Sequence, residues 1–158
     1  MKIKNKSKKL SVLEVLNARV DFEIFRPLLE KIWKNENIQL AGWQGWDRVM
    51  MFKILILQNL YELSDDATEY HVYDRLDFRR FLGLQLNDSV PDAKTIWKHK
   101  EDLVMSGKNE ELFMAYNNVL DTLGISIKAG RIVDATIIQI PQQEQNACEK
   151  DGETMSDQ

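Results

Sequence analysis

Residues 47–63 constrain the fold more than any other segment, because their sequence DRVMMFKILILQNLYEL is apolar on almost every face of a helix. A helix without a polar face is stable in water only when other elements surround it. Two glycines just before it, in AGWQG, favour a loop. The segment therefore predicts a central helix inside a helical bundle.

Helical spacing of apolar residues continues on both sides of this segment. Asp21 is a predicted N-cap for the first of these helices, and Pro27 is expected to kink or restart it. Ser64 and Asp92 are predicted N-caps, while Gly83 and Gly124 are predicted stops. The pattern predicts helices over residues 21–36, 47–63, 65–76, 77–83, 93–105 and 109–123.

Three segments depart from the helical pattern. Residues 1–20 open with lysines at positions 2, 4, 6, 8 and 9 and are predicted to form a basic, solvated arm. The sequence RIVDATIIQIP is rich in β-branched residues and is closed by Pro141, which predicts a strand within residues 128–141. Residues 142–158 are polar and acidic and are predicted to be a disordered tail. The predicted fold class is mainly α, with a helical domain over residues 21–125 and one strand.

Composition excludes several classes of protein. Cys148 is the single cysteine, and together with His71 and His99 it has no spacing typical of a zinc site. No run approaches the roughly 18 apolar residues of a membrane span, and the opening MKIKNKSKKL is too polar for a signal peptide, so we expect a cytoplasmic protein. The net charge of −4 means that any contact with DNA must come from local basic patches.

The helix predicted over residues 93–105 has two different faces. Steps of 100° place Lys94, Trp97, Lys98 and Glu101 on one side. The same steps place Ile96, His99 and Leu103 on the opposite side, which we expect to face the core. We interpret His99 as a core residue rather than a ligand or catalytic base, and His71 as structural.

Four blocks of the sequence occur in the order found in DDE transposases of the IS-five family, which this chain resembles. They are FKILILQNLYELSDDATEYHVYDRL, DFRRFLGL, DSVPDAKTIWKHKEDL and GRIVDATII, and they lie within roughly residues 20–141. The resemblance implies a helical N-terminal region that binds the terminal inverted repeats of a bacterial insertion sequence. It also implies a nucleoid-associated protein whose strand over residues 128–141 opens an RNase H-like catalytic domain.

The resemblance further implies that Asp134 is the first of three acidic residues that hold catalytic Mg²⁺ or Mn²⁺. Two metal ions need several carboxylates to activate a nucleophile and stabilise the leaving oxygen. The sequence ends 24 residues after Asp134 without a second recognisable acidic site. We therefore expect this chain to bind no metal and to cut no DNA by itself, and we expect its strand to lack sister strands. From the residues alone, a local turn hydrogen bond is the favoured explanation of Asp134.

A helix-turn-helix arrangement would place the helix over residues 93–105 in the major groove. Lys94, Thr95, Trp97 and Lys98 are then the predicted contacts to phosphates and bases. Three nearby arginines are predicted to contact the DNA backbone: Arg75, Arg79 and Arg80. The alternative is an ordinary solvated helix face, because Asp74, Asp77, Glu101 and Asp102 dilute the positive field.

Three functions are compatible with this sequence. The first is a truncated transposase that still recognises inverted repeats. The second is the first part of an active enzyme that is completed by a frameshift. The third is a helical module that binds and restrains full-length transposase, or self-associates, through its apolar helix or its strand.

Overall fold

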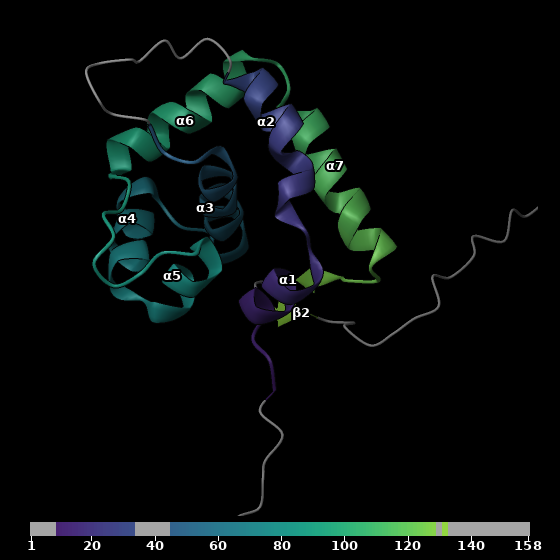
Figure 1. Cartoon of the computed structure of the whole chain (residues 1–158). Coiled ribbons are helices and arrows are strands. Elements are labelled where there is room, and N and C mark those ends of the chain that lie inside the picture. The colour runs from purple at the N-terminus through teal and green to yellow at the C-terminus, as the bar shows by residue number, and fades with distance from the viewer. Residues whose placement is uncertain (1–8, 34–44, 129–130, 133–158) are drawn as a thin grey trace, which may run out of the picture.

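Helices account for most of the chain that the structure describes, which confirms the mainly α class. The computed structural model describes residues 9–33, 45–128 and 131–132. Figure 1 shows their arrangement. The elements are α1 (Val12–Arg19), the 3₁₀ helix η1 (Phe22–Phe25), α2 (Arg26–Ile32), α3 (Arg48–Tyr61), α4 (Asp65–Asp74), α5 (Leu76–Leu82), α6 (Ala93–Met105), α7 (Asn109–Thr122), β1 (Ile127–Lys128) and β2 (Arg131–Ile132).

The central helix is α3, as predicted from its apolar sequence. It begins at the N-cap Asp47, whose Oδ2 accepts a hydrogen bond from the amide of Met50 at 3.0 Å. It packs against η1, α2, α4, α5 and α6. Its buried residues cover every side of the helix: Val49, Met50, Met51, Phe52, Ile54, Leu55, Ile56, Leu57 and Gln58.

Several other helices begin or end at predicted residues. Ser64 accepts a hydrogen bond from the amide of Ala67 at 3.1 Å and so caps α4. Gly83 ends α5 with φ of 74°, a left-handed conformation that glycine adopts without a steric penalty. Pro27 lies in the first turn of α2, directly after η1, so the chain restarts there as expected.

A helix that the sequence pattern did not predict occupies residues 12–19. These residues belong to the segment expected to be a basic arm, yet they form α1, with Leu13 and Leu16 buried against the core. Ser11 and Glu14 form a capping box, in which Ser11 Oγ accepts from the amide of Glu14 and the Glu14 carboxylate accepts from the amide of Ser11. That four-residue signature was the available signal. Residues 1–8 of the predicted arm lie outside the described residues.

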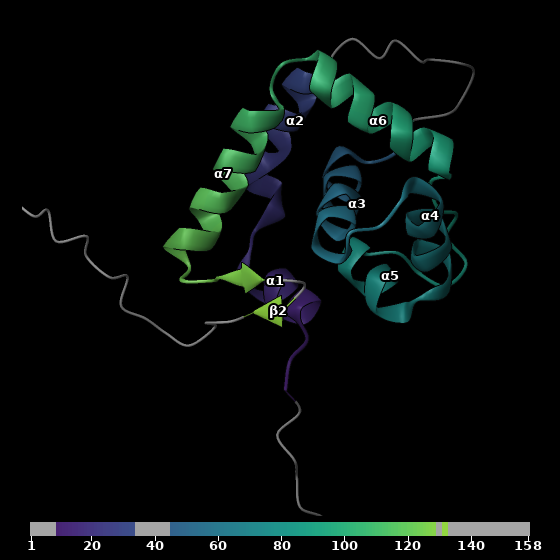
Figure 2. The same cartoon turned by 180° about the vertical axis from the view of Figure 1, so that it is seen from behind.

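Aromatic rings join the two sides of the bundle. Phe25 of η1 lies 5.2 Å from Phe52 of α3, centroid to centroid, and Phe52 lies 5.8 Å from Tyr116 of α7. In both views α7 lies beside α2, while α4, α5 and α6 lie on the other side of α3 (Figures 1 and 2). Aromatic packing thus holds α7 on a bundle whose other helices gather around α3.

The predicted strand has a partner at its beginning, contrary to expectation. Arg131 and Ile132 form β2, which pairs antiparallel with β1 in the register Ile127 to Ile132 and Lys128 to Arg131. Unpaired backbone groups are unfavourable, and the segment just before the strand supplies the nearest donors and acceptors. The described start of the strand is therefore part of a hairpin, and residues 133–158 lie outside the described part of the chain.

Candidate nucleic-acid interface

The outer face of α6 is the surface that sequence patterning predicts for DNA. Ile96, His99 and Leu103 are buried, whereas Lys94 and Lys98 are exposed and Trp97 is 51% exposed. This distribution confirms the predicted inner and outer faces. Thr95 is half-buried because it lies at the edge between them.

Two contacts with α4 fix the position of α6. Lys100 Nζ forms an ion pair with Asp65 Oδ1 at 2.6 Å, and the carboxylate of Glu69 accepts a hydrogen bond from the amide of Ala93 at 3.0 Å. The helix also packs on α3 and α4 through its buried side chains. Residues 83–92 connect α5 to α6, so the connection is longer than the three- or four-residue turn of a helix-turn-helix. Packing on α4, rather than a tight turn after α5, orients the outer face.

Charge on this face is mixed. Lys98 Nζ forms an exposed ion pair with Asp102 at 3.1 Å, one helical turn away. Lys94 makes no ion pair within the part of the chain that the structure describes. Exposed ion pairs of this kind contribute only about 0.3 to 0.5 kcal/mol. The pair is therefore weak enough to open when a phosphate group approaches Lys98.

Arg75 is half-buried and already engaged. Its guanidinium donates two hydrogen bonds to the carboxylate of Asp77, at 3.0 and 2.7 Å, and lies 4.4 Å from the ring centroid of Phe78. The hydrogen bonds to Asp77 raise the pKa of Arg75 above its ordinary value. Contact with a phosphate would therefore require Arg75 to share or release Asp77.

Arg79 is buried and has a structural role, which corrects its prediction as a DNA contact. It is only 5% exposed. Its guanidinium donates to the carbonyl oxygens of Tyr73 at 2.9 Å and Gln85 at 2.8 Å, with longer contacts to those of Leu86 and Asp88. These bonds fasten the connection between α5 and α6 to the end of α4. The neighbouring Arg80 is exposed and remains available to a ligand.

His99 is a core residue, as predicted, and its ring stacks on the indole of Trp33. The two centroids are 3.9 Å apart with 8° between the planes, and His99 is 4% exposed. Burial, reinforced by the positive charge of Arg48, lowers the pKa of His99 to about 3. His99 Nε2 has no hydrogen-bond partner among the described residues, so protonation would place an uncompensated charge in the core.

His71 packs between two aromatic rings, those of Tyr70 at 5.5 Å and Phe78 at 6.0 Å between centroids. This environment agrees with a structural role. The predicted metal ligand Asp134 lies outside the described residues. Within the described ranges, no group of three His, Cys, Asp or Glu side chains is placed to hold a metal ion. The same ranges contain no helix with the length and apolar character that crossing a bilayer requires.

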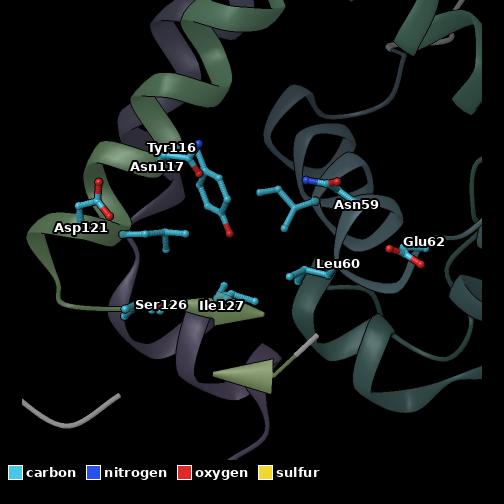
Figure 3. A pocket seen from close by; sticks show the side chains of 11 residues that line it. Asn59, Leu60, Glu62, Tyr116, Asn117, Asp121, Ser126 and Ile127 are labelled. Atoms are coloured by element: carbon cyan, nitrogen blue, oxygen red, sulfur yellow. The ribbon is translucent and has the colours of Figure 1, made fainter. Parts of the chain in front are cut away.

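A cavity of about 510 Å³ was not predicted from the sequence. It lies between α3 and α7 and reaches β1 (Figure 3). Its lining residues are Ile56, Asn59, Leu60, Glu62, Tyr116, Asn117, Leu120, Asp121, Ile125, Ser126 and Ile127. These residues come from two separate parts of the sequence, so no local motif signals the site.

Replacing the α6 N-cap tests how firmly this helix is held. Asp92 Oδ1 accepts from the amide of Thr95 at 2.7 Å, and hydrogen bonding by Thr95 lowers the pKa of Asp92. Asp92→Ala should lower the free energy of unfolding by about 1 kcal/mol in urea denaturation at pH 7. Because the ionised carboxylate is the better acceptor, the difference should shrink as the pH falls below about 3.9. The exposed Glu101→Ala serves as a control; an equal loss there would contradict a specific capping effect.

Comparison with known proteins places the chain in a family. No solved structure matches it. The family model described as Transposase domain (DUF772) matches residues 1–102. The match extends from before α1 into α6 and includes the helices that position the outer face of α6. A function related to transposition follows, and the chain belongs to the transposase domain (DUF772) family.

Proposed function

We propose that this transposase domain binds DNA through the outer face of α6 and recognises the terminal inverted repeats of an insertion sequence of the IS-five type. The observation that carries the proposal is the exposure of Lys94, Trp97 and Lys98 on a helix that α4 holds rigidly. Family membership supports a DNA substrate in general. An α-helix fits the major groove of B-DNA, where base edges are distinguishable.

Lysine side chains, rather than the helix N-terminus, are the expected phosphate contacts. Free amides at a helix N-terminus often bind anions. In α6, however, the amide of Ala93 donates to Glu69 and the amide of Thr95 donates to Asp92. Two carboxylates therefore already occupy this end of the helix, and Lys94 and Lys98 are the cations that remain on the outer face.

Trp97 and Arg80 have supporting roles in the proposal. Trp97 lies between the two lysines along the helix and would pack on a sugar or a thymine methyl group. Arg80 is exposed at the end of α5 and would add a backbone contact. Arg75 would contribute only if a phosphate competes with Asp77. Arg79 is left out of the interface because it is buried.

The salt dependence of the DNA-binding constant should report the number of phosphate contacts. Each neutralised phosphate contributes about 0.9 to the slope of log K against log salt. Lys94→Gln and Lys98→Gln should each reduce that slope by about 0.9 in gel-shift titrations with a duplex carrying the terminal repeat. Trp97→Ala should weaken binding without changing the slope.

A matched control is Lys31→Gln, which removes an exposed lysine from α2. It should leave the slope unchanged. A scrambled duplex separates sequence recognition from general attraction. If the wild-type chain leaves the mobility of the repeat duplex unchanged at low salt, the proposal is wrong.

Catalysis is a separate part of the proposal. By resemblance to the IS-five family, Asp134 is the first ligand of a Mg²⁺ or Mn²⁺ site in a DDE transposase, and we infer no further step from the described residues. Binding to full-length transposase, or self-association, is likewise a prediction that co-purification would test.

A further inference from the structure

The cavity between α3 and α7 combines an apolar middle with polar ends. Its apolar walls come from Ile56 and Leu60 of α3, Leu120 of α7, and Ile125 and Ile127 near β1. Its volume of about 510 Å³ lies within the range of small-molecule sites. The cavity therefore has the size of a small-ligand site, with an apolar patch inside a lining that is more polar than apolar.

Tyr116 supplies a buried polar group that lacks a partner. The residue is only 6% exposed, and its hydroxyl has no hydrogen-bond partner among the described residues. Figure 3 shows the hydroxyl pointing into the space bordered by Leu60 and Ile127. A buried hydroxyl is unfavourable without a hydrogen bond. A ligand that displaces the side chains covering this oxygen and donates an N–H to it would satisfy it.

Two acidic side chains, both exposed to solvent, lie at opposite edges of the cavity. Glu62 follows α3, and Asp121 lies near the end of α7 (Figure 3). Neither forms an ion pair within the described ranges of the chain. The amides of Asn59 and Asn117 add further acceptors for N–H groups.

The charge of the lining selects the class of ligand. None of the described residues that line the cavity is a lysine, arginine or histidine. A phosphate or carboxylate ligand would therefore meet two acidic groups and no cation. A ligand with positive charge at two ends and methylene groups between them would match both acidic walls and the apolar middle.

We propose that this cavity binds an aliphatic diamine or a longer polyamine. One ammonium group lies near Glu62 and the other near Asp121, with the methylene chain packed against Leu60 and Leu120. An N–H group donates to the hydroxyl of Tyr116. The proposal does not depend on DNA binding by α6, because it rests on a separate part of the molecule.

Titration of the full chain with 1,4-diaminobutane and with spermidine tests this site. Calorimetry gives the affinity, and amide and side-chain NMR signals report the location. We expect saturable shifts of the signals of Tyr116, Leu60 and Ile127. n-Butylamine has a similar body with one charge, and should bind at least about threefold more weakly, since it loses one ion pair near the surface.

Three conservative variants assign the contacts. Glu62→Gln and Asp121→Asn should each weaken diamine binding by about threefold, and Tyr116→Phe should do so while keeping the aromatic packing. Glu110→Gln removes an exposed acidic group from the first turn of α7, away from the cavity lining, and should have no effect. Circular dichroism checks that each variant is folded.

Three results would overturn the proposal. The first is that n-butylamine or N-acetyl-lysine methylamide binds as tightly as the diamine, because one cation, including a lysine of a partner protein, would then suffice. The second is that Glu110→Gln weakens binding as much as Glu62→Gln, because the amine would then be held only by general surface charge. The third is that no shifts occur at the cavity, because the amine would then not bind there.

Discussion

Lowering the pH from 7 to 4 should destabilise this protein by about 3 kcal/mol through His99 alone. The folded chain holds His99 neutral down to a pKa of about 3, because the ring is buried and lies near the charge of Arg48. The unfolded chain takes up a proton near the ordinary histidine pKa of about 6.5. Between these values the unfolded state binds more protons, so the free energy of unfolding falls as the pH falls.

Urea denaturation of the wild type and of His99→Phe at several pH values isolates this effect. Phenylalanine keeps a flat ring against Trp33 and removes the titrating nitrogen. The variant should lose about 3 kcal/mol less than the wild type between pH 7 and pH 4. Lys98 also opposes protonation of His99, whereas Asp102 favours it. Substitutions at these two positions should therefore slightly change the pH range over which His99 lowers the free energy of unfolding. Parallel pH profiles of wild type and variant would show that His99 is not the cause.

Arg79→Ala should lower the free energy of unfolding by about 3 kcal/mol, whereas Arg80→Ala should change it by less than about 0.5 kcal/mol. Removal of the buried guanidinium leaves the carbonyl oxygens of Tyr73 and Gln85 without their donor. Each hydrogen bond made by a charged group contributes about 1.5 to 3 kcal/mol. The exposed Arg80 next to it has no such role.

Hydrogen exchange and urea denaturation together test this pair of variants. Arg79→Ala should also increase amide exchange in residues 83–92, because the guanidinium fastens this connection. Arg79→Lys should recover only part of the stability, since an ammonium group lacks the planar fork that reaches several carbonyl groups. Equal losses for Arg79→Ala and Arg80→Ala would contradict the structural role of Arg79.

Local sequence patterns predicted the helices well, because capping and periodicity act over a few residues. Ser64 and Asp92 each accept the expected backbone hydrogen bond. The inner and outer faces of α6 followed from its 100° step alone. The same patterns did not predict α1, because the lysine run before it favours a solvated arm, whereas the capping box formed by Ser11 and Glu14 favours a helix.

Sequence patterns did not predict which charged residues are free. Arg75, Arg79 and Arg80 lie within six positions of one another, yet one is paired with Asp77, one is buried and one is exposed. Whether each arginine is paired, buried or exposed depends on the path of the connection between α5 and α6. That path is set by carbonyl groups that no side-chain pattern reveals.

The amino-acid sequence by itself determined the helical class, the limits of most helices and the central place of α3, because these depend on local hydrogen bonding and on the apolar surface of one segment. Only the tertiary structure decided that Arg79 is buried and holds the connection between α5 and α6, that β2 pairs with β1, and that Asn59 and Asn117 line the same cavity. Such features are contacts between groups that are distant in the sequence. Side-chain packing of the whole bundle, rather than any local pattern, determines these contacts.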